Sequence, residues 1–556
     1  MKLKTLFATL LVAASATTAF GQTHKEGEEY YKADQLNNAK ELLQRNMNNA
    51  GTDKAISNYY LGLIALREGN KSEAEKYFNA GTEANPDYAF NYVGLGQINL
   101  MNGNKKGAED LFKQAKGVLK NKEEKAALDI AIARAYYNVD PSLYAKEIDK
   151  NIVQAQKDSP KQGPAWTDPS IYLFEGDRFK DLKDVGKAAN QYEMAANYNP
   201  EATEAYVKYA NLFNQVNPEY AIQMLNRLLS INPQSALGQR ELANAYYNAG
   251  KFKEAAEEYN NYIKNPNHFK QDEDRYAFLL FYDKNYQGGY DYATQLLNAN
   301  PGNFTAQRFQ FMNAAQIDAM RDQLLPLAEK LVAAHNANPD NKFAPIDYIL
   351  IGDELSTAGR PQEAQALFEE AIANDPENPE FYKQLALVFV KENNLPKASD
   401  SFQNYIAKRE KPTYNDYVQQ ATYAFYAGEQ KRSENDTEGA NKYYTMSGEN
   451  ADKAFSMSSD YPKPIKIKGD IAKQTAPENE VGSAAVPLYT QAIAIFEGLS
   501  PQDQPRYVSD AKEMYNYMGN YYLDQNDKAT ALIYFDKYLQ LDPDNEGYRK
   551  FVDGLR

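Results

Sequence analysis

The chain has 556 residues, no cysteine and a formal net charge of −15, with 76 acidic residues against 61 basic ones. The lack of cysteine excludes disulfides, thiolate metal sites and cysteine nucleophiles together. The negative charge disfavours binding to nucleic acid, because such a surface repels phosphate groups and no basic stripe in the sequence offsets it. Mean hydropathy is −0.71, and no run after the first 21 residues is long and apolar enough to predict a membrane-spanning helix.

Residues 1–21 have the three-part pattern of a secretory signal peptide. Lys2 and Lys4 supply positive charge, an apolar run follows, and Ala19 and Gly21 are small residues three and one positions before the expected cleavage. The apolar run is shorter than the roughly 20 residues that span a bilayer, which disfavours the alternative of a membrane anchor. Removal of this segment changes the net charge to −17, because 59 basic residues then face 76 acidic ones. We expect an exported protein in the periplasm, with association with the outer membrane as an alternative.

After this segment, a pattern of small, aromatic and proline residues recurs about every 34 positions along most of the chain. In the clearest copy, Gly62 is followed by Ala74, Phe78 and Pro86, at offsets of 12, 16 and 24 residues. The same offsets hold for three further sets, which begin at Gly176, Gly352 and Gly519. Weaker or partial copies begin at Gly27, Gly96, Ala243 and Ala386. A fixed period of this length indicates stacked helical units.

Each copy predicts two amphipathic helices joined by a tight turn. In residues 55–66 the apolar side chains fall at helical spacing, as with Ile56, Tyr59 and Leu63. Seven residues after the small first-helix residue stands a type that tolerates the left-handed conformation of a helix end: Gly69, Gly103, Gly250, Gly359, Asn393 and Asn526. An Asn-Pro or Asp-Pro dipeptide then ends the second helix. The small and aromatic residues let helices pack closely, so we assign them to packing.

The period is lost in three stretches. Residues 157–169 hold three prolines and the single tryptophan, Trp166, which either pins a loop onto the helices or serves as a binding handle. In residues 303–345 the helical pattern persists with a lengthened first helix. Residues 428–486 include a dense basic patch of four lysines, which either bind an acidic partner or lipid headgroup or simply solvate a helix start: Lys463, Lys466, Lys468 and Lys473. We therefore expect repeat blocks at 22–157, 158–411 and 412–556, the last with an irregular insertion near 428–486.

Seven copies in phase, with glycines at the helix ends, resemble the tetratricopeptide repeat (TPR) family. The motif of that family has small residues, an aromatic residue and a closing proline at these separations, and the resemblance covers most of the mature chain. It implies an all-α, right-handed α-solenoid of about twelve helix-turn-helix repeats, and hence about two dozen helices.

In the TPR family the first helices of successive repeats line a concave groove that holds partner peptides. The resemblance implies that residues one and five positions after the packing residue of a first helix face this groove. Asn211, Asn244 and Asn520 each follow a small first-helix residue directly. Their amides either hydrogen-bond to an extended peptide or merely solvate the groove. Further candidates for partner contact lie nearby: Arg240, Tyr247, Asp274, Phe278 and Phe281.

Two other sequence features bear on binding. One TPR subtype holds a C-terminal carboxylate with basic and Asn residues. Arg240 and Asn244 match part of that set, whereas Gln271 and Phe278 occupy its other positions, which disfavours carboxylate clamping. Tyrosine is abundant, with 44 residues, and often occurs in pairs such as Tyr59-Tyr60. One member of each pair is expected to pack and the other to face the groove or solvent.

The sequence contains no constellation that predicts catalysis. The three histidines are far apart without companions at metal-ligand spacing, and no glycine-rich phosphate loop is present.

We expect a non-enzymatic scaffold without catalytic, metal or cofactor-binding residues. It would mediate protein–protein interactions in the cell envelope through its concave helix face, with partners that expose peptide or helix segments. The acidic surface favours basic partner segments. The alternative is a SusD-like carbohydrate-binding outer-membrane protein. Such proteins usually carry a lipoprotein cysteine and sugar-stacking tryptophans, whereas this chain has no Cys and one Trp.

Overall fold

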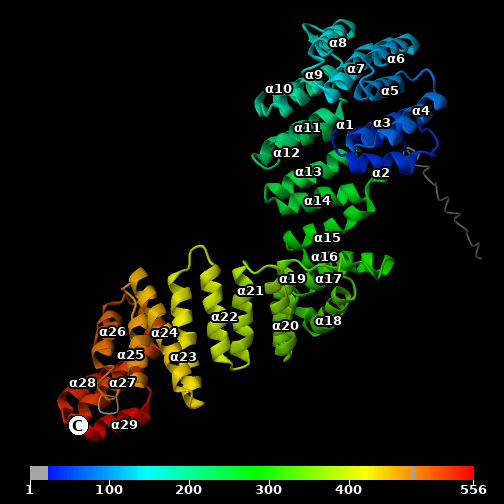
Figure 1. Cartoon of the computed structure of the whole chain (residues 1–556). Coiled ribbons are helices and arrows are strands. Elements are labelled where there is room, and N and C mark those ends of the chain that lie inside the picture. Colours follow the sequence, from blue (N-terminus) through cyan, green and yellow to red (C-terminus); the bar gives the residue numbers. More distant parts are fainter. Residues whose placement is uncertain (1–22, 478–479, 481) are drawn as a thin grey trace, which may run out of the picture. The chain divides into compact units, whose positions relative to one another are not determined.

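The computed structural model describes residues 23–477, 480 and 482–556, so the expected signal peptide lies outside the described residues. The chain divides into two compact units, residues 1–301 and 302–556. Each unit is a stack of helical hairpins (Figure 1). The three blocks expected from the sequence stay a prediction.

The first unit contains eight consecutive hairpins. They are α1 (His24–Lys32) with α2 (Leu36–Asn46), α3 (Lys54–Arg67) with α4 (Lys71–Ala84), α5 (Phe90–Met101) with α6 (Lys105–Val118), α7 (Lys125–Val139) with α8 (Ala145–Asp158), α9 (Pro169–Asp181) with α10 (Val185–Tyr198), α11 (Thr203–Phe213) with α12 (Pro218–Ile231), α13 (Ala236–Asn248) with α14 (Phe252–Ile263), and α15 (Glu273–Tyr282) with α16 (Tyr286–Ala299). Two 3-10 helices, η1 (Lys122–Glu124) and η2 (Lys270–Asp272), precede α7 and α15.

The second unit contains six hairpins and a final helix. They are α17 (Phe304–Ala314) with α18 (Arg321–Ala337), α19 (Pro345–Thr357) with α20 (Pro361–Asn374), α21 (Pro379–Lys391) with α22 (Leu395–Lys408), α23 (Tyr414–Ser433) with α24 (Thr437–Met457), α25 (Lys463–Thr475) with α26 (Val486–Gly498), α27 (Val508–Asp524) with α28 (Lys528–Leu541), and α29 (Glu546–Leu555). The 3-10 helices η3 (Asp318–Met320) and η4 (Gln504–Tyr507) precede α18 and α27. The described residues thus hold fourteen hairpins plus α29, where the sequence indicated about twelve repeats.

In ten of the fourteen described hairpins the turn contains a residue in the left-handed conformation. All six predicted glycine and asparagine positions have positive φ, for example Gly69 at 79° and Asn526 at 60°. Four hairpins place a residue there that the sequence pattern did not reveal, namely Asp34, Lys183, Lys284 and Asn435, with φ between 60° and 64°.

In seven of the fourteen described hairpins the core contains a contact between a first-helix glycine and an aromatic second-helix residue, whereas in the first hairpin Leu43 lies beside Gly27. A Cβ atom added to Gly62 would lie 2.4 Å from the ring of Phe78, and one added to Gly519 would lie 2.2 Å from the ring of Phe535. Phe78 and Phe535 are fully buried. The ring therefore occupies the space that a side chain on the first helix would need, which explains the offset of 16 residues in the repeat.

The three stretches without a clear period have different structures. Residues 157–169 form a small antiparallel hairpin of β1 (Lys161–Gln162) and β2 (Ala165–Trp166). The Trp166 ring packs against Tyr172 of α9 with 5.7 Å between centroids, and its backbone N–H donates to the Tyr172 hydroxyl. Trp166 therefore pins the loop, as the first of the two alternatives proposed.

In residues 303–345 the longer helix is the second one, α18 with 17 residues, whereas α17 has 11; the expected lengthening of the first helix was wrong. Residues 428–486 lose the period because α23 and α24 are 20 and 21 residues long, against 14 in most second helices. Within that stretch the chain is helical over most of its described length.

The four lysines of α25 and its end are engaged within the second unit. Lys463 pairs with Asp510 at 2.7 Å, and Lys468 pairs with Asp452 at 2.6 Å. Lys466 is buried and pairs with Asp470 and Glu513, at 2.8 and 2.6 Å. The ammonium of Lys473 lies over the rings of Tyr489 and Tyr517. The basic cluster of the sequence is therefore largely neutralised by its own surroundings.

We expect Gly62→Ala to destabilise the first unit by about 1–3 kcal/mol, because the new methyl group collides with the buried Phe78 ring. Gly117→Ala in α6 is the matched control, since no atom lies within 4 Å of its added Cβ, and we expect it to be neutral or stabilising by up to about 1 kcal/mol. Urea unfolding followed by circular dichroism measures both. Equal midpoints for the two variants would contradict the packing role of Gly62.

Candidate functional site

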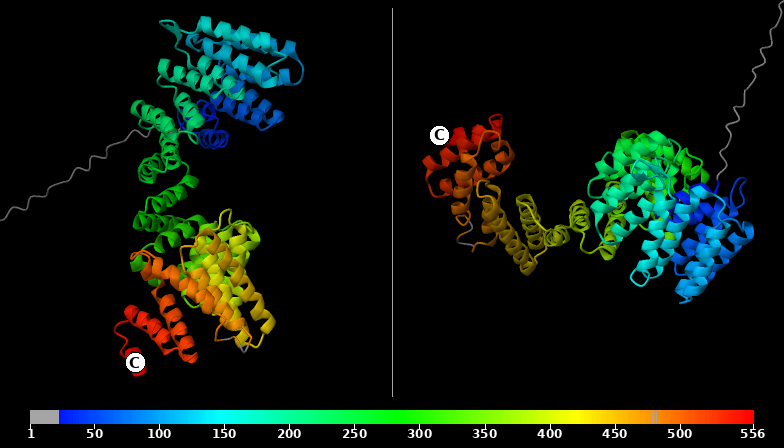
Figure 2. Two further views of the ribbon diagram at one scale, coloured as in Figure 1. Left: turned by 90° about the vertical axis from the view of Figure 1, so that its left-hand side faces the viewer. Right: turned by 90° about the horizontal axis from the view of Figure 1, so that it is seen from above.

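The first hairpin of the chain closes back onto helices far along the sequence. Gln35 donates from Nε2 to Glu241 of α13 at 2.7 Å, and the Tyr30 ring packs edge-on against Phe269 at 5.4 Å. Lys208 of α11 donates to the Asp34 carboxylate at 2.7 Å. Figures 1 and 2 show the blue α1–α2 hairpin beside the green α11 and α13. The first helices of six hairpins, from α1 to α11, therefore surround a partly open space.

This space consists of two adjoining cavities of about 440 and 410 Å³, here called the inner cavity. They share six lining residues: Tyr31, Asp34, Leu63, Arg67, Arg134 and Asp177. Each shared side chain comes from a first helix or its end, so the hairpins present one face to the cavity and the other to their packing partners.

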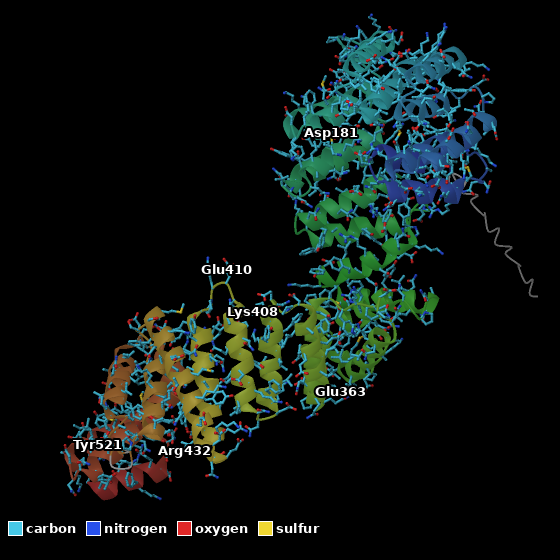
Figure 3. The ribbon with its side chains drawn as sticks, in the orientation of Figure 1. Asp181, Glu363, Lys408, Glu410, Arg432 and Tyr521 are labelled. Atoms are coloured by element: carbon cyan, nitrogen blue, oxygen red, sulfur yellow. The ribbon has the colours of Figure 1, made fainter. Side chains whose placement is uncertain are left out.

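The positions that face the cavity follow the offset rule of the TPR resemblance. The packing residues of the first five hairpins are Gly27, Gly62, Gly96, Ala133 and Gly176. One position further on stand Glu28, Leu63, Gln97, Arg134 and Asp177, and all five line the inner cavity. Five positions further on stand Lys32, Arg67, Met101, Asn138 and Asp181, and these also line it. Figure 3 labels Asp181 at the end of α9.

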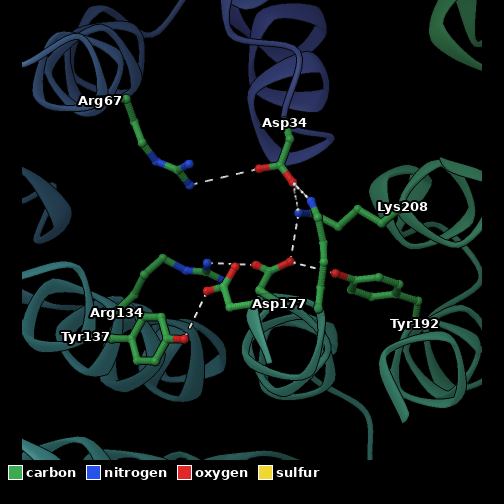
Figure 4. Close-up of polar contacts among 9 residues, drawn as sticks. Asp34, Arg67, Arg134, Tyr137, Asp177, Tyr192 and Lys208 are labelled. Carbon is green, nitrogen blue, oxygen red and sulfur yellow. Dashed lines mark hydrogen bonds and ion pairs between the residues drawn. The ribbon is translucent and has the colours of Figure 1, made fainter. Parts of the chain in front are cut away.

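A network of charges joins the helices around the cavity (Figure 4). Asp34 accepts from Lys208 at 2.7 Å and from Lys180 at 3.1 Å, and it lies 3.9 Å from Arg67. Asp177 accepts from Lys208 at 2.9 Å and from Arg134 at 2.7 Å. The network thus ties α1, α7, α9 and α11 together, and the Lys208 side chain is only 6% exposed.

These charges stay ionised because they are paired. Burial alone would raise the pKa of Asp177, but Arg134 and Lys208 outweigh it and hold the pKa well below its ordinary value. Burial likewise opposes the charge of Asp34, yet Lys208 lowers the pKa of that carboxyl. Removing one partner would leave a buried charge without compensation, which typically costs about 3–5 kcal/mol.

One side of the inner cavity is aromatic. Tyr31, Tyr59, Tyr60, Tyr88 and Phe90 line it and are here called the aromatic wall. Their rings contact one another, with 5.1 Å between the centroids of Tyr31 and Tyr60 and 5.3 Å between those of Tyr88 and Phe90. The Tyr59 ring lies 5.1 Å from Tyr60 and 5.6 Å from Phe90. Both members of the Tyr59-Tyr60 pair therefore pack and line the cavity at once.

Carboxylates accompany the aromatic wall. Glu28 accepts from the Tyr60 hydroxyl at 2.9 Å and pairs with Lys32 at 2.7 Å. Burial opposes its charge, but Lys32 lowers the pKa of the Glu28 carboxyl. Glu123 and Glu124 line the same part of the cavity.

The residues that the sequence proposed for partner contact lie outside the inner cavity. Asn211 is exposed on α11, and Asn244 is half-buried on α13. Asn520 is exposed on α27 in the second unit, beside the Tyr521 labelled in Figure 3, and donates to the Asn516 carbonyl at 2.9 Å. Asn520 thus belongs to a different unit from Asn211 and Asn244.

Arg240 is engaged within the first unit. Its Nε donates to Asp272 at 2.7 Å and its Nη1 to Gln35 at 3.2 Å. This guanidinium therefore holds the first hairpin against α13 and η2. Its use for a partner would require those contacts to break.

The aromatic candidates form a cluster on α13 and α15. The rings of Tyr247 and Phe278 lie 5.6 Å apart, and the Arg275 guanidinium lies over both. Phe281 contacts the Tyr282 ring at 5.6 Å, and Asp274 lies half-buried in the first turn of α15. Partner binding by these residues stays a prediction.

The residues of the inner cavity were missed although the rule that finds them was available. The asparagines proposed for partner contact stand one position after the packing residue in later repeats. In the repeats from Gly27 to Gly176, the positions one and five residues after the packing residue hold all ten lining residues named above. The offset from the packing residue therefore identifies the lining residues of the inner cavity, whatever their residue type.

Comparison with known families agrees with this geometry. Models described as tetratricopeptide repeat match residues 24–89, 59–124, 211–272, 355–418 and 512–545. Repeated helical hairpins with these matches define an all-α solenoid, a class that generally serves as a non-catalytic scaffold for protein–protein interactions. The chain therefore contains tetratricopeptide repeats.

Solved structures of TPR proteins resemble the chain at low identity. The C-terminal part of a TPR repeat-containing protein from Cytophaga hutchinsonii is 20% identical over 51% of this chain and 99% of its own, with a TM-score of 0.40. A TPR protein from Parabacteroides merdae is 16% identical over 55% and 97%, with a TM-score of 0.31. Yeast Tom70 is 14% identical over 88% and 94%, with a TM-score of 0.30.

A search of curated proteins gave no match. None of the described helices combines the length and apolar character that crossing a bilayer requires. The described residues also contain no group of three or more His, Asp or Glu side chains placed to hold a metal ion.

We expect the stability of the first unit to depend on Glu29 with a distinct pH profile. Burial, reinforced by Glu204 and Glu26, raises the pKa of Glu29 from its ordinary value of 4.5 to about 7. The folded protein thus holds this proton more tightly than the unfolded chain does, so stability falls as the pH rises between these values. Glu29→Gln should therefore stabilise the protein by about 1–3 kcal/mol at pH 8, with the gain vanishing near pH 5.

Glu28→Gln is the control within the same helix. The lowered pKa of Glu28 means that its stabilising charge is present at neutral pH and is lost only below the ordinary range of a glutamate. This variant should therefore be less stable than the wild type at pH 7. Urea unfolding between pH 5 and 8 measures both, and a pH-independent effect of Glu29→Gln would contradict the assignment.

Proposed function

We propose that this TPR protein is exported to the cell envelope and holds a segment of a partner protein in the inner cavity. The observation that carries this proposal is that different positions on the first helices pack the hairpins and line the cavity. Gly62 and its equivalents pack inside the hairpins, while residues one and five positions further on converge on one partly open space. Their side chains vary in charge, size and polarity from repeat to repeat, as a surface that discriminates between ligands requires.

The dimensions of the inner cavity support a short segment as its occupant. Its two parts, of about 440 and 410 Å³, fall in the range of roughly 300–1,000 Å³ in which protein pockets bury a ligand. Such a volume accommodates a few side chains of a peptide or helix, and it is too small for a folded domain.

Two features of the sequence support export. Residues 1–21 have the pattern of a cleavable signal peptide, and the chain has no cysteine that could mispair in an oxidising compartment. Location in the periplasm, with partners among envelope proteins, follows from these features as part of the proposal.

Photocrosslinking in the cells that produce the protein tests the partner. With p-benzoylphenylalanine at Met101 or Asn138, which line the inner cavity, we expect the same protein to be crosslinked from both positions. The matched controls carry the probe at Glu83 or Lys113, which are exposed on the second helices α4 and α6. If the inner positions capture nothing that the outer ones do not, the cavity is not the binding site.

Calorimetric titration with glycans tests the alternative of a carbohydrate-binding protein, since saturable binding would favour a carbohydrate ligand.

Export is tested separately. We expect the mature protein to begin at Gln22 and to fractionate with periplasmic markers, whereas a chain without residues 2–21 should remain with cytosolic ones. N-terminal sequencing and fractionation measure this. A product that retains Met1 in the cytosol would contradict export and leave the role of the cavity unaffected.

A further inference from the structure

We propose that the aromatic wall of the inner cavity binds the cationic side chain of a lysine or arginine in the partner segment. This inference rests on the proposed function, in that the segment carries the cation into the cavity. It goes further by assigning the chemistry that is recognised and the part of the cavity that recognises it.

The faces of aromatic rings attract cations because the ring quadrupole is negative above and below its plane. Five rings meet in the aromatic wall at different tilts, with 62° between the planes of Tyr59 and Tyr60 and 74° between those of Tyr59 and Tyr88. Rings that face a space from several directions form the arrangement in which an ammonium or guanidinium group is held by more than one face.

The Tyr59 hydroxyl is a further group that can contact the cation. Its side chain lines the cavity, and its hydroxyl is not committed to another described residue, whereas the neighbouring Tyr60 donates to Glu28. A phenol oxygen can accept from the N–H groups of lysine or arginine.

Negative charge is in excess in the same place. Eight carboxylates line the inner cavity against five lysine and arginine side chains. Glu123 and Glu124 have no ion pair with a cation in the described part of the chain, and Glu204 lies 4.0 Å from Lys32.

The cations of the inner cavity are already committed. All five lie within 4.0 Å of a carboxylate: Lys32, Arg67, Arg134, Lys180 and Lys208. An anionic ligand would have to compete with these pairs and leave a carboxylate uncompensated, which is costly inside a protein. A cationic ligand would instead meet carboxylates without such partners. The inner cavity therefore selects for positive charge.

The test uses the purified chain without residues 1–21 and mixtures of heptapeptides with one fixed central residue. The central residue is lysine, arginine, norleucine or glutamate, and the flanking positions are equimolar mixtures. Norleucine keeps the aliphatic stem of lysine without its charge. By fluorescence anisotropy we expect the lysine and arginine mixtures to bind at least about tenfold more tightly than the other two. The preference should shrink as salt is added.

Variants then place the preference in the cavity. Glu123→Gln combined with Glu124→Gln should reduce the preference for lysine over norleucine to about threefold or less, because the unpaired carboxylates are neutralised. Tyr59→Phe removes one hydroxyl and should weaken binding of the lysine and arginine mixtures more than that of the norleucine mixture. The matched control combines Glu75→Gln with Glu83→Gln on the outer helix α4, where both residues are exposed, and should keep the wild-type preference. Circular dichroism verifies that each variant is folded.

The inference is overturned if lysine and norleucine mixtures bind equally, if the glutamate mixture binds most tightly, or if no mixture binds. It is also overturned if the preference survives unchanged in the Glu123 and Glu124 variant. In each of these cases crosslinking from Met101 and Asn138 can still identify a partner, so the proposed function survives. A peptide preference without any cellular crosslink would count against the proposed function alone.

Discussion

The contact between a first-helix glycine and an aromatic ring of the second helix, present in seven of the described hairpins, determines much of the rest of this structure. When Phe78 fills the space beside Gly62, one side of α3 is used for packing, and the direction of every other residue on that helix follows from the helical repeat. The same contact recurs between Gly176 and Tyr192 and between Gly519 and Phe535. Because it orients each first helix in the same way, side chains at fixed offsets collect on a common face. The inner cavity of the first unit is the result of that repetition over six hairpins.

Closure of the first unit depends on a different kind of interaction. Neighbouring hairpins pack through apolar and aromatic side chains, whereas the first hairpin meets α11 and α13 through charged and polar groups as well, among them Asp34, Lys208 and Gln35. Paired charges of this kind are specific in geometry and costly to leave unpaired. They therefore favour one register of closure over others. Apolar contacts alone are more tolerant of sliding.

Much of the fold could be predicted from the sequence because its determinants are local. Proline after the second helix and glycine or asparagine between helices act within a few residues, and the left-handed turns at Gly69 and Asn526 are as predicted. The offset rule also holds, since it depends only on helix geometry. The pairing of Asp34 with Lys208 could not be predicted, because 174 residues separate them and nothing in either neighbourhood marks the other. The ion pairs of the α25 lysines with α24 and α27 could not be predicted either, because Asp452 and Asp510 lie on other helices than Lys468 and Lys463.

Closure also has a consequence for the order in which the protein forms. Contacts within a hairpin join residues close in sequence, so the hairpins can form rapidly and one after another from the N-terminus. The surface of the first hairpin around Tyr30 and Asp34 has no counterpart until α11 to η2 have been synthesised, some 170 to 240 residues later. During that interval other chains can contact Tyr30, which is buried in the folded protein, and Asp34, which is not yet paired with Lys208. The α1–α2 hairpin is thus made well before the helices that complete its surroundings, and chaperones and proteases can reach it while the chain is incomplete.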